Sequence, residues 1–308
     1  MQIQPSSREL VSIVLCSYNG EIYLEEQLKS IQQQTYTEIE IIVVDDCSTD
    51  KSFLIAEQAA ALDSRIKCYR QKTNVGYNKN FLFGFELAKG NHISIADQDD
   101  IWILNKIEFM MSNLWVNPDV KLIHCKSLKF KNGDTPGLNK THLYRSFKGN
   151  DVRKIFLFNA ISGHNIIFKR ELLPDITELP VGLYYDWWIN IIACSKGVIN
   201  STEKILTHQR VHGNNATTGN DKSIYLQYSV CNFLPLILSY KNISKKDKDF
   251  GEILLKKNNG WTPDKFSFPL FFFLLKHASI FFHYKRRVFP YFSYLKMAYR
   301  ISAGKIKI

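Results

Sequence analysis

Three acidic residues stand within four positions of this chain, at Asp97, Asp99 and Asp100. They follow the short apolar stretch 92–96, which is typical of a buried strand. Carboxylates this close repel one another, so folding gains nothing from the cluster unless a cation or a hydrogen-bond donor lies beside it. In open α/β sheets, bound molecules lie beyond the carboxyl ends of the strands. A site that offers only oxygen atoms to a metal favours Mg²⁺ or Mn²⁺ over zinc. The alternative interpretation is a solvated acidic turn.

A second pair of acids, Asp45 and Asp46, follows the apolar stretch 39–44. In a parallel sheet the two strand ends face the same edge, so both groups of acids are expected at one site. One group can hold the metal of a diphosphate, and the other can accept hydrogen bonds from a base or a ribose. The alternative for this second pair is helix capping, for which one acid would suffice.

Stretches with the pattern of strands and helices alternate along the first 130 residues. Strands are expected at 11–17, 39–44, 65–71, 92–96 and 120–130, and helices at 21–34, from about 50 to 62, at 77–88 and at 107–116. Alternation with short links predicts an α/β fold, with a mostly parallel sheet covered by helices on both faces.

The six cysteines form no C-x-x-C pair, which is typical of buried thiols in a reducing compartment. The N-terminal residues 1–9 lack a cationic start followed by an apolar core, so no signal peptide is expected. These observations predict a cytoplasmic protein. With 308 residues, the chain can bury one large core or two smaller ones.

The net charge of +11 is confined to the end of the chain. Residues 1–240 contain 25 Lys and Arg against 25 Asp and Glu, whereas residues 241–308 contain 15 against 4. A basic segment can bind an anionic membrane or a nucleic acid. The even balance over the first 240 residues argues against a long basic track, so no nucleic-acid partner is expected.

The basic segment alternates with two apolar stretches, 266–275 and 278–282, and is followed by the basic run 285–287. Pro269 and Lys276 interrupt the roughly 20 apolar residues that a spanning helix requires. We therefore expect this segment to lie on an anionic membrane surface, with the phenylalanines of both stretches in contact with lipid. The alternative is a helix docked on the protein's own core.

Four motifs together resemble the family 2 glycosyltransferases: VSIVLCSYNG at 11–20, DDCSTD at 45–50, NVG at 74–76 and ADQDDIW at 96–102. The resemblance implies the Rossmann-like GT-A fold and the use of nucleotide-diphosphate sugars. It divides the chain into a catalytic domain over 1–220 and a helical, basic, aromatic extension over 221–308. The variant at 96–102 looks most like bacterial rhamnosyltransferase-type members that build surface polysaccharides.

The same resemblance implies roles for single residues. Asp46 matches the acid that contacts the base, and the pair Asp97 and Asp99 matches the acids near the ribose and the metal. His212 stands in a run suited to a loop that closes over a diphosphate. The full expectation is nucleotide contact at Ser17, Asn19, Asp46, Asn74 and Asp97, metal contact at Asp99 and His212, and further contacts at Asp100 and Arg210. Cys47 departs from the family, which most often has a small residue such as Gly there.

Asp186 matches the catalytic base of the family. Sugar transfer needs a group that takes a proton from the acceptor hydroxyl, and a carboxylate in a cavity wall can do so. The neighbouring Trp187 and Trp188 are expected to stack on sugar rings. The alternatives are an acid in the first turn of a helix and two ordinary core residues.

Taken together, these features predict an inverting, metal-dependent glycosyltransferase that uses Mg²⁺ or Mn²⁺ and works in bacterial surface polysaccharide synthesis, such as O-antigen or capsule. The expected partners are a nucleotide-diphosphate sugar, first of all dTDP-rhamnose, and a saccharide or lipid-linked oligosaccharide acceptor at the cytoplasmic face of the inner membrane. The alternatives are a UDP-hexose transferase and a non-catalytic nucleotide-sugar-binding relative. A nucleotidyltransferase would carry a Gly-rich, basic loop after its first strand, and residues 17–21 are not such a loop.

Overall fold

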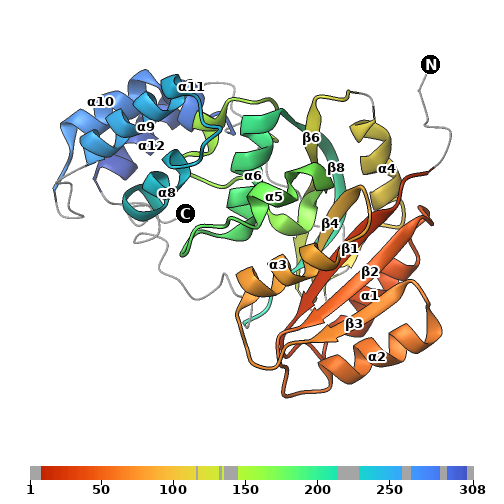
Figure 1. Cartoon of the computed structure of the whole chain (residues 1–308). Coiled ribbons are helices and arrows are strands. Elements are labelled where there is room, and N and C mark those ends of the chain that lie inside the picture. The colour runs from red at the N-terminus through yellow and green to blue at the C-terminus, as the bar shows by residue number, and fades with distance from the viewer. Residues whose placement is uncertain are drawn as a thin grey trace.

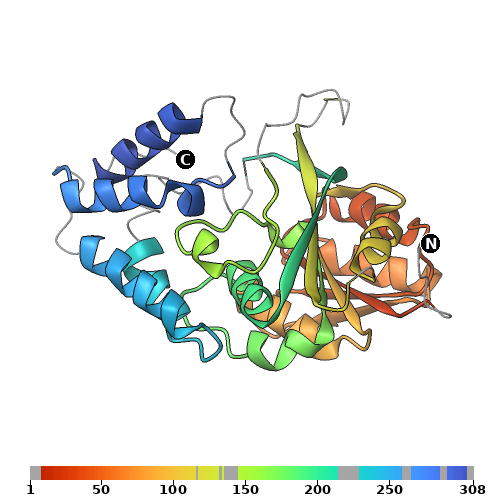
Figure 2. The same cartoon turned by 90° about the horizontal axis from the view of Figure 1, so that it is seen from above.

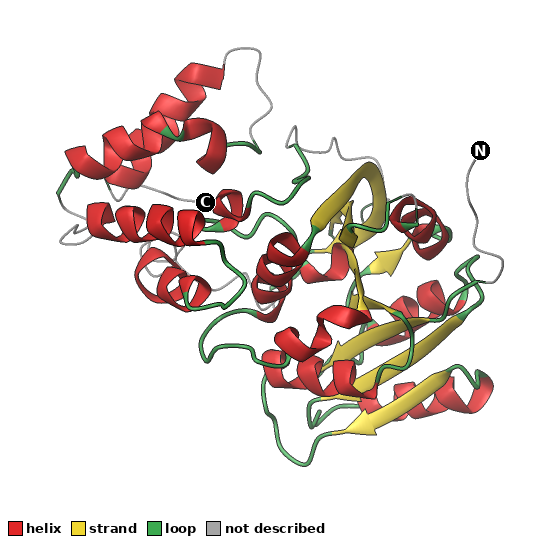
Figure 3. Ribbon diagram, turned by 45° about the horizontal axis from the view of Figure 1, so that its top comes forward, coloured by secondary structure: helices red, strands yellow, loops and turns green. Residues whose placement is uncertain are grey.

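A mixed sheet forms the centre of the structure, which is a computed structural model that describes residues 8–115, 117–131, 134, 145–213, 229–258, 265–284 and 290–303. In these residues the strand order is β3-β2-β1-β4-β7-β6-β8-β5. Figures 1 and 3 show the sheet with helices packed against it. The strands are β1 (Val11–Ser17), β2 (Ile39–Asp45), β3 (Ile66–Arg70), β4 (His92–Asp97), β5 (Ile101–Trp102), β6 (Val120–Phe130), β7 (Ile166–Lys169) and β8 (Val198–Arg210).

The first four helices begin and end within a few residues of their predicted bounds. The helices of the described residues are α1 (Leu24–Gln32), α2 (Ser52–Leu62), α3 (Tyr77–Leu87), α4 (Lys106–Leu114), α5 (Leu173–Ile176), α6 (Tyr185–Lys196), α8 (Leu234–Leu238), α9 (Lys245–Asn258), α10 (Phe268–Lys276), α11 (Ala278–Phe281) and α12 (Pro290–Ser302). Short 3₁₀ turns lie at Val152–Ile155, Gly163–Asn165 and Arg170–Leu172, and a π-helical turn lies at Ser229–Phe233.

The four N-terminal strands β1 to β4 pair in parallel, as the alternation of strand and helix predicted. The second half of the sheet differs, because β7 runs antiparallel to both β4 and β6, and β5 runs antiparallel to β8. β6 and β8 are again parallel. A short apolar stretch such as β7 carries no signal for its direction, which depends on the path of the chain that leads to it.

Side chains of β1 point alternately into two cores, which confirms helices on both faces of the sheet. Ile13 and Leu15 belong to a core with Leu28 of α1 and Met110 of α4. Val14 belongs to the opposite core, which α3 and α6 help to form. Strands buried on both faces read as continuous apolar runs, and β2 is buried at all seven positions.

The C-terminal helices dock on α6 and its neighbours. Leu254, Leu274 and Phe282 belong to the same buried cluster as Trp187 of α6. Helices α8 to α12 gather on one side of the molecule, and α2 and β3 lie on the other (Figures 1 and 2). This packing is what the docked-helix alternative expects, and the expected membrane contact stays a prediction. The predicted boundary of the extension at 220 lies outside the described residues.

Within the ranges that the structure covers, no helix combines the length and apolar character that crossing a bilayer requires. The basic run 285–287 lies outside these ranges.

Replacing Phe282 by Ala should lower the free energy of unfolding by about 3–5 kcal/mol, because its fully buried ring would leave a cavity. Phe272→Ala is the matched control, since 61 % of Phe272 is exposed and its loss should change stability by less than about 0.5 kcal/mol. Urea denaturation followed by circular dichroism measures both. Equal effects would contradict the docking of the extension.

Candidate active site

The carboxyl ends of β1, β2 and β4 meet at one edge of the sheet. Ser17 pairs with Asp45 across β1 and β2, and Cys16 pairs with Asp97 across β1 and β4. The two groups of acids predicted from the sequence therefore converge, as expected for parallel neighbours.

Asp45 is fully buried and is satisfied inside the protein. Its carboxylate accepts hydrogen bonds from the backbone N–H of Ser48 at 2.9 Å and from the hydroxyls of Ser48 and Ser17, the latter at 3.2 Å. Arg70 lies 3.5 Å away. This acid organises the turn after β2, and the hydroxyl of Ser17, predicted to line the nucleotide pocket, contacts Asp45.

Asp46 holds the loop that follows β3. Its two carboxylate oxygens accept hydrogen bonds from the backbone N–H groups of Val75, at 2.7 Å, and Gly76, at 2.9 Å. Asn74 is exposed on the same loop. Each of these oxygens keeps a further lone pair, so base contact by Asp46 stays a prediction.

The loops after β1 and β2 are joined by Asn19, whose side-chain oxygen accepts from the backbone N–H of Thr49 at 2.9 Å. Asn19 and Cys47 both have left-handed backbone conformations, with φ of 48° and 63°. Glycine adopts this conformation most readily, which explains the preference of the family at the Cys47 position. The turn forms with cysteine all the same.

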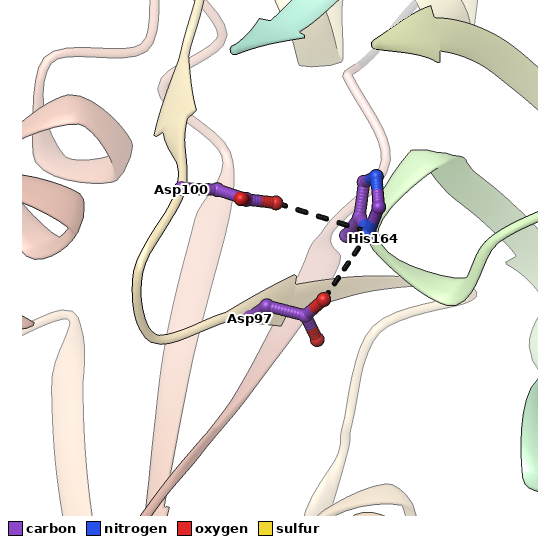
Figure 4. Close-up of side chains that lie close together, drawn as sticks. All are labelled: Asp97, Asp100 and His164. Atoms are coloured by element: carbon purple, nitrogen blue, oxygen red, sulfur yellow. Dashed lines mark hydrogen bonds and ion pairs between the residues drawn. The ribbon is translucent and has the colours of Figure 1, made fainter. Parts of the chain in front are cut away.

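A histidine lies between two carboxylates of the acidic turn (Figure 4). Nδ1 of His164 is 3.1 Å from Oδ2 of Asp97 and 3.8 Å from Oδ2 of Asp100, and one ligand atom of each lies within 4.8 Å of the others. Burial alone would lower the pKa of the imidazole, but the two carboxylates outweigh it and raise that pKa. His164 therefore lies where its protonated form would offset the repulsion within the turn.

The end of β8 also donates hydrogen bonds to the acidic turn. The backbone N–H of Arg210 donates to Oδ1 of Asp100 at 3.1 Å, and its Nε donates to the carbonyl of Asp99 at 3.0 Å. Its guanidinium also pairs with Glu26 and lies against the rings of Tyr23 and Phe130. Arg210 is buried, so in this structure it positions the turn.

Asp100 is buried, and its carboxylate is only partly hydrogen-bonded. Its Oδ2 is buried without a hydrogen-bond partner, and burial raises the pKa of the carboxyl, an effect that His164 partly opposes. Such an oxygen needs a proton or a cation beside it.

Asp99 and His212, the predicted metal contacts, lie side by side although 113 positions separate them. Nε2 of His212 is 2.8 Å from Oδ2 of Asp99, and the imidazole lies against the ring of Tyr23, with centroids 4.9 Å apart. Burial and the charge of Asp97 raise the pKa of the Asp99 carboxyl. Carboxylate oxygens with one imidazole form a donor set that Mg²⁺ or Mn²⁺ accepts.

The candidate ligands form two groups. The side chain of Asp97 is 39 % exposed, and those of Asp99 and His212 are 14 % and 17 % exposed, whereas Asp100 and His164 are almost closed to solvent. A metal that also contacts a diphosphate keeps open coordination positions. Asp99 and His212, the outer group, keep partial access to solvent, which favours them for such a metal. Asp97, Asp100 and His164 form the inner group, whose ligand atoms lie within 4.8 Å of one another.

Asp186 stands in the first turn of α6 and is half-buried. It accepts a hydrogen bond from the backbone N–H of Trp187 at 2.7 Å, and the nearby backbone N–H of Gly163 also favours its charged form. Burial, with a contribution from the charge of Asp97, raises the pKa of its carboxyl to about 6. Because Gly163 precedes His164, this contact joins Asp186 to the acidic turn.

The expectation that Trp187 and Trp188 stack on a sugar is wrong. Both rings are buried, and their indole N–H groups donate to the carbonyls of Ile155 at 2.8 Å and Asp175 at 3.0 Å. The sequence could not separate these core rings from a binding surface, because aromatic residues serve both purposes. The aromatic pair near Asp186 that does reach solvent is Tyr77, which is 45 % exposed, with Tyr184 stacked on it.

Sequence reasoning missed the roles of His164 and Lys106. The ammonium of Lys106 is fully buried and donates to the carbonyl of His164 at 2.7 Å and to Thr207 at 2.9 Å. Polar residues 163–165 inside an apolar stretch were the available signal for His164. Lys106 gave none, because a lysine on a helix is usually exposed.

Comparison with known proteins gives a consistent result. The family model described as "Glycosyl transferase family 2" matches residues 12–177. The mannosyltransferase PcManGT of Pyrobaculum calidifontis, solved in complex with GDP-Man and Mn²⁺, has a similar fold, with a TM-score of 0.61 at 19 % identity. The match covers 97 % of this chain and 86 % of that one. These similarities confirm the expected GT-A fold.

Two curated relatives have informative names. The UDP-Glc:alpha-D-GlcNAc-diphosphoundecaprenol beta-1,3-glucosyltransferase WfaP of Escherichia coli is 26 % identical, over 72 % of this chain and 85 % of the relative. The GalNAc(5)-diNAcBac-PP-undecaprenol beta-1,3-glucosyltransferase of Campylobacter jejuni is 26 % identical, over 78 % and 77 %. Other relatives are matched over smaller shares of their length, 43 % and 33 % in two cases.

Asp99→Asn should weaken Mn²⁺ binding by at least about 10- to 100-fold, because it removes a ligand of the outer group. His164→Gln should keep most of the affinity, and Asp119→Asn, at an exposed loop position, is the neutral control. Titration of Mn²⁺ followed by electron paramagnetic resonance measures all three variants. If His164→Gln loses Mn²⁺ affinity while Asp99→Asn keeps it, the metal is assigned to the inner group instead.

Proposed function

The chain belongs to glycosyl transferase family 2, and on that premise we propose that it is an inverting enzyme with a lipid-linked saccharide as acceptor. The donor is a nucleotide-diphosphate sugar, and the product belongs to a bacterial surface polysaccharide such as O-antigen or capsule. The names of both informative relatives support this, since each acts on a saccharide joined to undecaprenol through a diphosphate. A lipid-anchored acceptor also supports a peripheral position at the cytoplasmic face of the inner membrane.

The observation that carries the proposal is the Asp186 carboxylate beside the acidic turn. Its pKa of about 6 leaves it mostly ionised at neutral pH yet basic enough to take a proton. In the proposed reaction the acceptor hydroxyl attacks the anomeric carbon from the side opposite the departing diphosphate, while Asp186 takes the proton of that hydroxyl. Inversion follows from this single displacement.

The donor lies, in this proposal, along the carboxyl edge of β1, β2 and β4. Asp46 receives the base, the loop residues Ser17, Asn19 and Asn74 surround it, and Asp97 lies near the ribose. Asp99 and His212 would hold Mg²⁺ or Mn²⁺, which supplies positive charge to offset that of the departing diphosphate. The ties of Asp45, Asp46 and Asn19 to neighbouring backbone fix these loops before the donor arrives.

Among donors, a UDP-hexose has the stronger support. Both informative relatives are named as glucosyltransferases, and one name specifies UDP-Glc. The support for dTDP-rhamnose is the resemblance of the 96–102 motif to rhamnosyltransferase-type members. A non-catalytic relative would have no need of a half-buried carboxyl with a raised pKa beside the acidic turn, which favours an enzyme.

Asp186→Asn should lower kcat by at least about 100-fold and hardly change donor affinity, because the base acts on the acceptor. In the unaltered protein, kcat/KM should fall as the pH drops below about 6, where the carboxyl becomes protonated and can no longer accept a proton. The residual activity of the variant should not show this fall at low pH. Steady-state assays against pH, with Asp119→Asn as control, measure both effects. A loss of donor affinity with normal kcat would instead make Asp186 a structural cap.

A panel of nucleotide sugars should identify the donor by thermal shift. A ligand present at about 100 times its Kd stabilises the folded state by roughly 2.7 kcal/mol, so a true donor is readily distinguished. UDP-glucose with Mn²⁺ should raise the melting temperature more than dTDP-rhamnose, and Asp99→Asn should reduce that shift. A larger shift with dTDP-rhamnose would select the rhamnosyl donor instead.

A further inference from the structure

The two-helix face formed by α10 and α12 gathers exposed apolar side chains at the edge of the molecule. Of the fifteen large apolar residues that are exposed in the described part of the chain, six belong to these two helices. Their exposed fractions range from 45 % to 80 %. They are Phe268 and Phe272 on α10, and Tyr291, Phe292, Leu295 and Tyr299 on α12.

The spacing on each helix places these residues on one side. On α12 three of them stand four positions apart, at 291, 295 and 299, while Ala298 and Ile301 of the same helix are buried. On α10 the exposed pair is also four positions apart, while Leu270 and Leu274 are buried. Both helices therefore pack on the core with one side and present aromatic rings on the other.

The two exposed rows are neighbours. The backbone N–H of Ser267, which caps α10, donates to the carbonyl of Ser302 at the end of α12 at 2.9 Å. The ring of Phe266 contacts Phe268, with centroids 4.8 Å apart, and Tyr299, with centroids 5.5 Å apart. In Figures 1 and 2 both helices lie at the end of the molecule opposite β3.

The charges on the two helices themselves have one sign. Within the described residues 265–284 and 290–303 the charged residues are Lys265, Lys276, Lys296 and Arg300, with no Asp or Glu. Lys276 and Lys296 are exposed on the two helices themselves. A second copy of the chain on this face would bring like charges together, because a two-fold interface pairs each surface with itself. An anionic bilayer offers the complementary charge and an apolar interior in which aromatic rings lie at the boundary.

We propose that the two-helix face docks on an anionic lipid bilayer, with its aromatic rings in the headgroup boundary and its lysines on lipid phosphates. The inference is independent of the sugar-transfer chemistry. The residues proposed to contact lipid differ from those expected from the sequence. Phe281 and Phe282 are core residues, and only Phe272 of 271–273 is largely exposed. Docking on the core and binding to a membrane are compatible, since they use opposite sides of the same helices.

The test is flotation of the full-length protein with vesicles of phosphatidylcholine, with and without phosphatidylglycerol. The protein should float with the anionic vesicles and stay behind with the neutral ones, and high salt should release it. The double variant Tyr291→Ser/Phe292→Ser should lower the bound fraction by about tenfold or more, because two rings leave the boundary. Lys276→Glu/Lys296→Glu should lower binding to anionic vesicles in a salt-dependent way.

The matched control is Leu54→Ser/Leu62→Ser, which removes two exposed apolar side chains from α2 on the far side of the molecule. It should bind vesicles like the unaltered protein. Thermal melts of all variants should coincide, since each substituted side chain is exposed. Unchanged flotation of the Tyr291/Phe292 variant, equal binding to neutral vesicles, or no binding at all would overturn the proposal. A dimer in sedimentation velocity that this variant abolishes would assign the face to a second copy.

Discussion

The crowding of carboxylates at the end of β4 is the constraint on which the site depends. Three acids in one turn cannot be ionised together without nearby positive charge or hydrogen-bond donors. The protein supplies these from distant parts of the chain, with His164 between Asp97 and Asp100 and the backbone N–H of Arg210 on Asp100. His212 lies on Asp99. The acidic turn therefore draws the segment before β7 and the end of β8 toward β4, and so determines how the second half of the chain closes over the first.

The acids at the end of β2 have a different physical role. Asp45 and Asp46 accept hydrogen bonds from Ser17 at the end of β1 and from the loops after β2 and β3, so both carboxylates are stabilised without a ligand. Their effect is to hold those loops in one arrangement beside the acidic turn. The edge of the sheet thus combines a rigid region, suited to a nucleotide, with a region of unbalanced negative charge, suited to a metal.

The same region connects to the proposed base through a short path. The backbone N–H of Gly163 lies near enough to Asp186 to favour its charged form, and the next residue, His164, contacts the acidic turn. Lys106 helps to hold this segment in place, because its ammonium donates a hydrogen bond to the carbonyl of His164. Any shift of the 163–164 backbone would therefore move the base relative to the acids. On the other side of α6, the C-terminal helices complete the core that holds Trp187 in place.

The sequence alone determined the β1-to-β4 part of the fold, because apolar β-branched stretches and their helical links report local structure directly. It also determined that the acids converge, since parallel strands end at one edge, and it singled out Asp99, Asp186 and His212 through motifs. Only the tertiary structure decided the direction of β7, the buried positions of Trp187 and Trp188, and the recruitment of His164 and Lys106. Those properties depend on which distant segments pack together. Amphipathic stretches such as α10 and α12 show that two faces exist, and only packing decides which of them meets the core.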